Sequence, residues 1–122
     1  MLFIRKKALN RLAEPYREPG MLMCYATPQH LHTYSTRALL LVNQEKLVVL
    51  FLNLFSTRVV HQSELAIADL QEQKFKSGVG LGAVWSFKVN GSSWRFQIMW
   101  TILTLGSMQR DFLTFVETHI ID

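Results

Sequence analysis

The sequence predicts an α+β fold that is mainly β, with about seven strands, one amphipathic helix before them and one after. Apolar residues alternate over short runs between residues 21 and 99, and they recur at helical spacing near both ends of the chain. The 122 residues are 49% hydrophobic and 18% charged, which is enough apolar material to offset the entropy of folding. A chain of this length is expected to form one domain with a single core.

The first predicted element is an amphipathic helix from about Phe3 to Glu14. Its apolar side chains recur every three or four residues, with the basic side chains largely opposite. They are Ile4, Ala8, Leu9, Leu12, Ala13 and Tyr16. Pro15 and Pro19 stop the helix, because proline lacks the backbone N–H that a helix interior needs. We assign residues 1–20 to this helix and its linker and residues 21–122 to the domain. The apolar face of the helix could pack on the domain, on a partner or on a membrane surface.

Seven strands are expected after the helix. They are Met21–Thr27, Arg37–Val42, Leu47–Asn53, Arg58–Ile67, Leu70–Lys76, Ala83–Val89 and Ser93–Met99. The most hydrophobic stretch, Ala38–Phe55, is broken by the polar residues NQEK. It therefore predicts two strands and a turn rather than a membrane span of about 20 residues. Residue types in Ser63–Phe75 favour a helix by propensity, with Ser63 as its cap, but strands are expected there from a resemblance given below.

Three glycines follow the lysines of the segment KFKSGVGLG, which covers residues 74–82. A dinucleotide-binding loop would need GxGxxG between a strand and a helix. Here the spacing is GxGxG and a strand pattern follows, and the sequence holds no P-loop GK[ST]. Gly78, Gly80 and Gly82 are therefore interpreted as a flexible turn between two strands.

The strongest local signal is the hairpin around Asn90-Gly91, which suits a type I′ turn because both positions need positive φ. Counting outward predicts four cross-strand pairs, which are Val89 with Ser92, Phe87 with Trp94, Trp85 with Phe96 and Ala83 with Ile98. Strand alternation then separates two faces. The expected core face holds Trp85, Phe87, Val89, Trp94, Phe96 and Ile98, and the expected solvated face holds Ser86, Lys88, Ser93, Arg95 and Gln97.

A second amphipathic helix is predicted at the end of the sequence. Ser107 is its expected N-cap, and an apolar stripe follows at helical spacing. The stripe consists of Met108, Phe112, Phe115, Val116 and Ile120. The spacing predicts a helix that packs on the sheet, with use of the stripe as a partner groove as the alternative.

This order of elements resembles the bacterial pleckstrin-homology-like (PH-like) domains over about residues 21–120. The resemblance rests on the hairpin LLLVNQEKLVVLFLN, on the run AIADLQEQKFKSGVGLGAVWSFKVNGSSWRFQI and on the terminal FLTFVETHI. In that family a short acidic turn and a lysine- and glycine-containing segment precede the last hairpin. Asp69-Leu70 and Lys76–Gly82 look like these parts. The resemblance implies a strongly bent, nearly closed antiparallel sheet with the C-terminal helix plugging one end, and a binding or scaffolding module rather than an enzyme.

The positive charge is uneven along the chain. The formal net charge is +4, and residues 1–20 contribute +3 of it, from five basic residues against Glu14 and Glu18. A basic excess can steer anionic partners, although a solvated surface is its commoner meaning. The residues that we expect to contact an anionic surface are Arg5, Lys6, Lys7, Arg11, Lys74 and Lys76.

The function expected is that of a non-catalytic interaction module in the cytoplasm, whose partner is another protein or a second copy of the chain. No signal peptide is expected, because charges interrupt the opening MLFIRKKALN. The alternative is peripheral membrane attachment, in which Ile4, Leu9 and Leu12 enter the bilayer interface while the neighbouring cations meet anionic head groups. Phosphoinositide binding, frequent among eukaryotic relatives of the family, has little support, because Tyr25–Arg37 holds one arginine and two histidines.

Other chemistry has less support in the sequence, and neither a cofactor nor a metal is expected. The single cysteine, Cys24, excludes an intrachain disulfide. His30 and His32 share one side of an extended segment and could bind zinc, but no third ligand is identifiable, and His61 and His119 stand alone. No nucleophile elbow or triad-like motif is present, so no catalytic residue is assigned and no enzymatic activity is expected.

Nucleic acid is not expected as a partner. Lys74, Lys76, Lys88 and Arg95 could share an exposed sheet surface. The aromatic residues of the hairpin face the other way by its register, so no platform for base stacking accompanies these cations.

Overall fold

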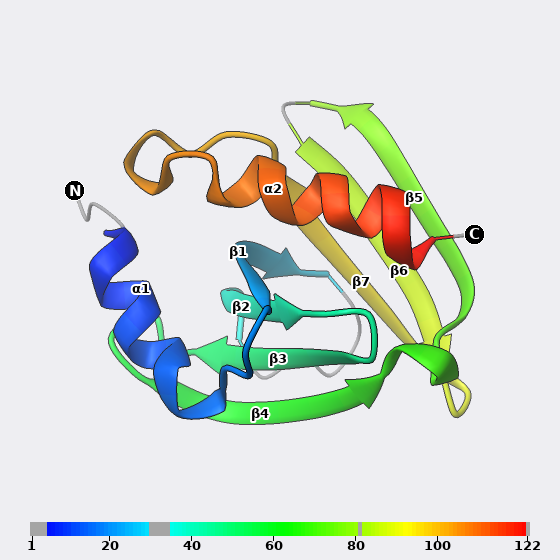
Figure 1. The fold of residues 1–122 in the computed structure, drawn as a ribbon, viewed down its shortest axis with the longest axis horizontal. Helices are drawn as coiled ribbons and strands as arrows, with labels where there is room; N and C mark the ends of the chain where they lie inside the picture. Colours follow the sequence, from blue (N-terminus) through cyan, green and yellow to red (C-terminus); the bar gives the residue numbers. More distant parts are fainter. Residues whose placement is uncertain (1–4, 30–34, 81, 122) are drawn as a thin grey trace.

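The computed structural model describes residues 5–29, 35–80 and 82–121. They form seven antiparallel strands and two α-helices (Figure 1). The strands are β1 (Leu22–Pro28), β2 (Ala38–Val42), β3 (Lys46–Leu52), β4 (Val59–Ala66), β5 (Gln71–Val79), β6 (Gly82–Val89) and β7 (Ser92–Met99). The helices are α1 (Lys6–Ala13) and α2 (Met108–Phe115), and α2 continues into a π-helical turn over Val116–Ile120. The predicted fold class, α+β and mainly β, is confirmed.

The strands form one sheet in the order β4-β3-β2-β1-β7-β6-β5. Within the described residues, β1 and β7 pair at two positions, Thr27–Gln97 and Pro28–Phe96. The sheet bends at this short junction into two halves, β1–β4 and β5–β7, and α2 packs against β1 and β7 (Figure 1). A strongly bent antiparallel sheet closed by a C-terminal helix is the PH-like arrangement that the sequence predicts.

Two apolar clusters hold the fold together. The inner cluster lies between the two halves of the sheet and α2. It includes Cys24, Leu40, Val49, Phe51, Trp85, Phe87, Phe96, Ile98, Phe112, Leu113 and Val116. The outer cluster lies on the opposite face of β1–β3, beneath α1. It consists of Leu9, Ala13, Met21, Met23, Leu39, Leu41, Val48, Leu50, Leu52, Leu105 and Met108.

The first helix shares this outer cluster with the strands. Leu9 is 1% exposed and Ala13 is fully buried, and Leu12 and Tyr16 pack against the same cluster. Ala8, which the sequence places on the apolar face, is instead exposed, because it lies on the side of α1 that points away from the sheet. Because α1 covers the outer face, every residue of β2 is buried, and β2 and β3 read as continuous apolar runs. The chain then continues from α1 into a 3₁₀ turn, Glu14–Tyr16, where Pro15 is tolerated because the first residues of a helical turn need no N–H partner.

The predicted hairpin is confirmed in its register. All four predicted cross-strand pairs are present between β6 and β7. Asn90 and Gly91 have φ angles of 51° and 81°, as a type I′ turn requires. The predicted core face is buried except for the half-buried Trp94. The segment 63–75 also forms strands as predicted, because β4 and β5 are joined by a 3₁₀ turn over Ile67–Asp69.

The interpretation of the glycine run is right for Gly80 and wrong for the other two glycines. Gly80 has a φ angle of 63° in the turn between β5 and β6, a conformation that glycine adopts without strain. Gly78, with a φ angle of 86°, lies within β5 where the pairing with β6 shifts register between Ser77 and Val79. Gly82 instead begins β6 opposite Met99, and a Cβ at Gly82 would lie 2.6 Å from the carbonyl oxygen of Ile98. Gly82 therefore permits a close approach of two strands rather than a turn.

The second helix also differs from its prediction in one detail. Ser107 directly precedes α2, but its hydroxyl donates to Oδ2 of Asp111 at 2.9 Å and makes no capping bond with the backbone. Gln109, which the predicted stripe omits, is fully buried. Its amide accepts from the N–H of Tyr25 and donates to the carbonyls of Tyr25 and Met99 at 2.7, 2.9 and 3.0 Å. These bonds join α2 to both β1 and β7, at the junction of the two halves.

Candidate functional site

Basic side chains gather on the outer face of β5–β7, the half of the sheet that α1 does not cover. Lys74 and Lys76 point outward from β5, because alternate residues of a strand share one face. Lys74 pairs with Ser86 on β6, and Ser86 pairs with Arg95 on β7. The register therefore places a lysine, a serine and an arginine in one row across three strands.

These residues line a pocket of about 310 Å³, together with Val84. Neighbouring strands lie about 4.8 Å apart, so the backbones of Lys74 and Arg95 are separated by about 10 Å across Ser86. Lys76 lies two residues farther along β5, about 7 Å from Lys74. Long cationic side chains with this spacing can converge on one ligand above the Ser86 hydroxyl.

The three cations of the pocket have no carboxylate partner among the described residues. The ion pairs within the described residues lie elsewhere, and they join Lys46 to Glu18 and Glu64, and Lys88 to Glu72. Arg95 is positioned by a bond from its Nε to Oε1 of Gln29 at 3.2 Å. No hydrogen bond within the described residues uses the two terminal nitrogens of Arg95. The pocket thus combines concentrated positive charge with unused N–H donors.

A cluster of this composition suits an anion. Arginine presents its donors in a planar fork that matches carboxylate and phosphate oxygens, and lysine adds a point charge that adapts to the ligand. The Ser86 hydroxyl can donate a further hydrogen bond. A tetrahedral phosphate or a carboxylate could therefore meet three or four donors in the pocket at the same time.

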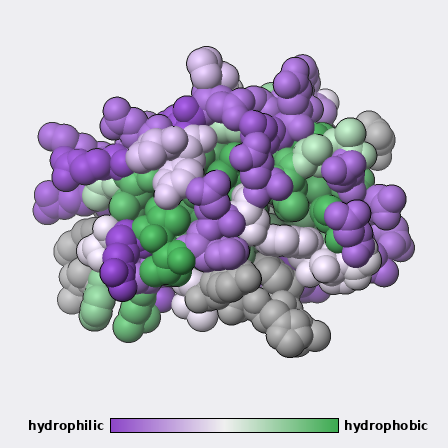
Figure 2. Space-filling view, turned by 90° about the horizontal axis from the view of Figure 1, so that it is seen from below, coloured by the Kyte–Doolittle hydropathy of each residue, from purple (hydrophilic) through white to green (hydrophobic). Residues whose placement is uncertain are grey.

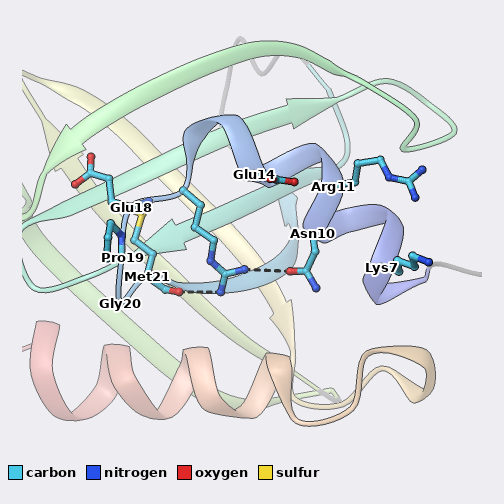
Figure 3. A pocket seen from close by; sticks show the side chains of 9 residues that line it. Lys7, Asn10, Arg11, Glu14, Glu18, Pro19, Gly20 and Met21 are labelled. Carbon is cyan, nitrogen blue, oxygen red and sulfur yellow. Dashed lines mark hydrogen bonds between the residues drawn. The ribbon is translucent and has the colours of Figure 1, made fainter.

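A second hollow, of about 760 Å³, lies where α1 meets the start of β1 (Figure 3). Its lining mixes charges, with Lys7 and Arg11 beside Glu14 and Glu18. Arg17 spans the hollow as a structural group, because its terminal nitrogens donate to Oδ1 of Asn10 at 3.0 Å and to the carbonyl of Met21 at 2.9 Å. This hollow is larger than the basic pocket, but acidic residues lie among its cations and Arg17 is held by the fold, so its lining is less purely basic.

Glu18, at the rim of this hollow, also stabilises β3. Its carboxylate and that of Glu64 both bind the ammonium group of Lys46, at 2.5 and 2.6 Å. The two carboxylates raise the pKa of Lys46, chiefly through the hydrogen bond that the Lys46 ammonium donates to Glu18. Lys46 is thus a cation with two carboxylate partners, whereas the three cations of the basic pocket have none among the described residues.

The structure separates the six cations that the sequence singles out into two groups. Lys74 and Lys76 share the basic pocket. Lys7 and Arg11 line the larger hollow, and Arg5 and Lys6 are exposed at the start of α1. Ser86 and Arg95 are missing from that predicted set. The sequence analysis does place Arg95 with Lys74, Lys76 and Lys88 on one exposed sheet surface, and the structure confirms that all four are exposed on β5–β7. The pairing of β5 with β6 adds Ser86 and brings Lys74 beside it.

The predicted mode of membrane insertion needs a correction. Leu9, on the side of α1 that faces the sheet, is buried, and Leu12 is half-buried against the outer cluster. The sheet therefore already covers the apolar face of α1 that was expected to enter a bilayer. Ile4 lies outside the described residues. No helix in the described part of the chain is long and apolar enough to cross a membrane.

The remaining candidate groups do not assemble into a reactive centre among the residues described. Burial raises the pKa of the Cys24 thiol well above its ordinary value, which keeps the group protonated. The rings of His61 and His119 lie near those of Phe51 and Phe115, at 5.9 and 5.0 Å between centroids. Across residues 5–29, 35–80 and 82–121, no three His, Cys, Asp or Glu side chains come together as metal ligands. His30 and His32 lie outside these ranges.

Among solved structures, the chain is similar to the hSac2 domain from the human phosphoinositide phosphatase Sac2. The sequence identity is 8% and the TM-score is 0.48, over 91% of this chain and 76% of that chain. No protein-family model matches the sequence, and no curated protein matches it. The assignment of a PH-like fold rests on the strand order of the sheet and on the C-terminal helix of this chain.

Proposed function

We propose that this protein is a non-catalytic binding module, related to the bacterial PH-like domains, that recognises an anionic group of a partner protein. The proposed site is the basic pocket of Lys74, Lys76, Ser86 and Arg95. The observation that carries the proposal is the gathering of three cations around one hydroxyl without a carboxylate partner in the described residues. An acidic or phosphorylated side chain of the partner would supply the missing negative charge.

A binding role agrees better with these residues than a catalytic one. Lysine, arginine and serine in the pocket can hold an anion, but no general base stands beside the Ser86 hydroxyl to activate it as a nucleophile. Cys24, the one cysteine, is fully buried. Aromatic side chains of the hairpin point into the inner cluster, which favours a single anionic group over stacked nucleic-acid bases as the ligand.

Inorganic phosphate is a suitable probe for this site. We expect phosphate to raise the melting temperature of the protein above that in chloride at equal ionic strength, because a ligand that binds only the folded state stabilises it. At a phosphate concentration about ten times Kd, the rise is on the order of 3–6 °C. The triple variant Lys74→Gln/Lys76→Gln/Arg95→Gln should lose this difference.

The matched control is Lys6→Gln/Arg58→Gln/Arg110→Gln, which removes three exposed cations elsewhere and should keep the phosphate response. Phosphate also stabilises folded proteins in general by exclusion from their surfaces, and this general effect is equal in both variants. A phosphate response that survives in the triple variant would contradict the proposed site. A response lost equally in the control would show a diffuse charge effect and would contradict it too.

A further inference from the structure

Exposed apolar side chains mark the end of the molecule opposite the β6–β7 hairpin. Leu103 is 96% exposed, Leu54 is 64% exposed and Phe55 is 60% exposed. Single exposed apolar residues are ordinary on protein surfaces. These three differ because they occupy the tips of two loops, the β3–β4 turn and the β7–α2 loop, that lie at the same end of the long axis (Figure 1).

Both loops are held in place by the outer cluster and its neighbours. Ile102 and Leu105, on either side of Leu103, pack into the outer cluster, and Val59 does so at the start of β4. The hydroxyl of Ser56, in the β3–β4 turn, lies 3.0 Å from that of Tyr25. The loop tips therefore project from supported bases, and their apolar side chains are left without cover.

Cations lie between the two apolar tips. Figure 3 shows Lys7 and Arg11 pointing from α1 toward the end where the β3–β4 turn and the β7–α2 loop lie. Arg58 is exposed beside the β3–β4 tip, and Arg110 is exposed in the first turn of α2 next to Asp111. Figure 2 shows hydrophobic groups reaching the surface among hydrophilic ones at this end of the molecule. Apolar tips ringed by cations complement a surface that is apolar inside and negatively charged outside.

We propose that this end of the molecule docks on an anionic lipid bilayer. Leu54, Phe55 and Leu103 enter the interface, while Lys7, Arg11 and Arg58 contact the head groups. Membrane attachment by a small apolar group alone is weak, and a neighbouring basic patch makes it stable. Here the apolar loop tips and the cations lie at the same end of the molecule. The proposal is independent of the basic pocket, because none of these residues lines it.

Flotation with vesicles tests the proposal. We expect the full chain to float with vesicles of phosphatidylcholine and phosphatidylserine and not with phosphatidylcholine alone. Leu54→Ser/Phe55→Ser and Leu103→Ser should each weaken binding by about tenfold or more, because each removes apolar contact with the interface. The variant Lys88→Gln, which removes an exposed cation beside the β6–β7 turn at the other end of the molecule, should bind like the wild type. These positions are exposed, so the variants should fold normally, which circular dichroism would verify.

A fluorescent label locates the contact directly. Cys24 is the one cysteine and is fully buried, so Leu103→Cys can be labelled selectively with an environment-sensitive dye. Vesicles with phosphatidylserine should shift its emission to the blue, and the same dye on Ser92→Cys, at the start of β7 beside the β6–β7 turn, should not respond. No flotation of the wild type, unchanged flotation of the serine variants, or a shift at position 92 without one at 103 would each overturn the proposal.

Discussion

The two halves of the sheet share one core on their inner faces and differ on their outer faces. The outer face of β1–β3 is apolar and lies beneath α1, with residues such as Leu39, Leu41 and Leu50 fully buried. The outer face of β5–β7 carries no helix and presents Lys74, Lys76 and Arg95 around a pocket. One half uses its outer face for stability, and the other leaves its outer face open to solvent.

This difference explains the strand patterns in the sequence. β7 and the second half of β6 alternate between apolar and polar residues, because one face meets the core and the other meets water. β2 is buried at every position, because α1 supplies a second cover. A continuous apolar strand therefore indicates a covered outer face, and an alternating strand with unpaired cations indicates where to look for a ligand.

The largest expected loss of stability comes from a register change in β5–β7, the half of the sheet that α1 does not cover. Inserting one glycine between Asn90 and Gly91 should turn one strand of the β6–β7 hairpin over, so that its polar side chains face the core. We expect the free energy of unfolding to fall by more than about 4 kcal/mol, measured by urea titration. A glycine inserted between Phe55 and Ser56, in an exposed turn, is the control and should be tolerated. Equal stability of both insertions would refute the assigned register.

A charge placed beneath α1 tests the covered half. Leu9→Asp buries an unpaired carboxylate in the outer cluster and should cost about 4 kcal/mol of unfolding free energy or prevent folding. Ala8→Asp adds the same charge to the same helix at an exposed position and should change stability by less than about 1 kcal/mol. If the two variants unfold at the same urea concentration, α1 is not part of the core.

The shared inner core should show a pH dependence through Cys24. Its pKa is raised in the folded state by burial, so the unfolded chain loses the thiol proton first. Stability is therefore complete below the unfolded pKa of about 8.5 and falls as pH rises above it, by at most about 1.4 kcal/mol per pH unit. Cys24→Ala should lose this part of the slope in urea titrations between neutral and alkaline pH. An identical slope in the variant would show that the thiol is not protected by the core.

The smallest expected effect compares a paired cation with an unpaired one. Lys46→Gln breaks two ion pairs and should lower the melting temperature, since its raised pKa shows that the folded state favours the charged form. That contribution is present below the ordinary lysine pKa of about 10.4 and is lost as pH rises through the folded value. Lys74→Gln should change unfolding free energy by less than about 0.5 kcal/mol. A clear destabilisation by Lys74→Gln would mean that this cation serves the fold rather than a ligand.

Local patterns predicted most of the fold. The Asn90-Gly91 turn fixed the register of the last hairpin, and apolar runs located most of the strands, because both signals depend on nearby residues. The strands over Ser63–Phe75 were predicted from the resemblance to PH-like domains, against their local helix propensity. Gly82 was misread because its constraint comes from the backbone of β7, across the sheet. The support beneath α1 could not be predicted for the same reason, since an apolar helix face does not specify what covers it.

The candidate site was only partly predictable. Lys74 and Lys76 stood out by composition, and Arg95 lay on a face that the hairpin register predicted to be solvated. The pocket itself depends on the pairing of Lys74 with Ser86, whose register is set by the two irregularities in the β5–β6 pairing, between Gln71 and Lys74 and between Ser77 and Val79. The exposed tips Leu54, Phe55 and Leu103 gave no sequence signal, because apolar residues next to strands and helices are usually buried.

The most direct test of the central claim is a phosphate titration followed by the backbone amide shifts of the protein in solution. The account predicts that the amides of Lys74, Ser86 and Arg95 move together and saturate with one affinity, while those of Lys7 and Arg11 in α1 remain still at matched ionic strength. Saturating shifts in α1 with none in β5–β7 would contradict it, because the anion would then bind the covered half of the molecule.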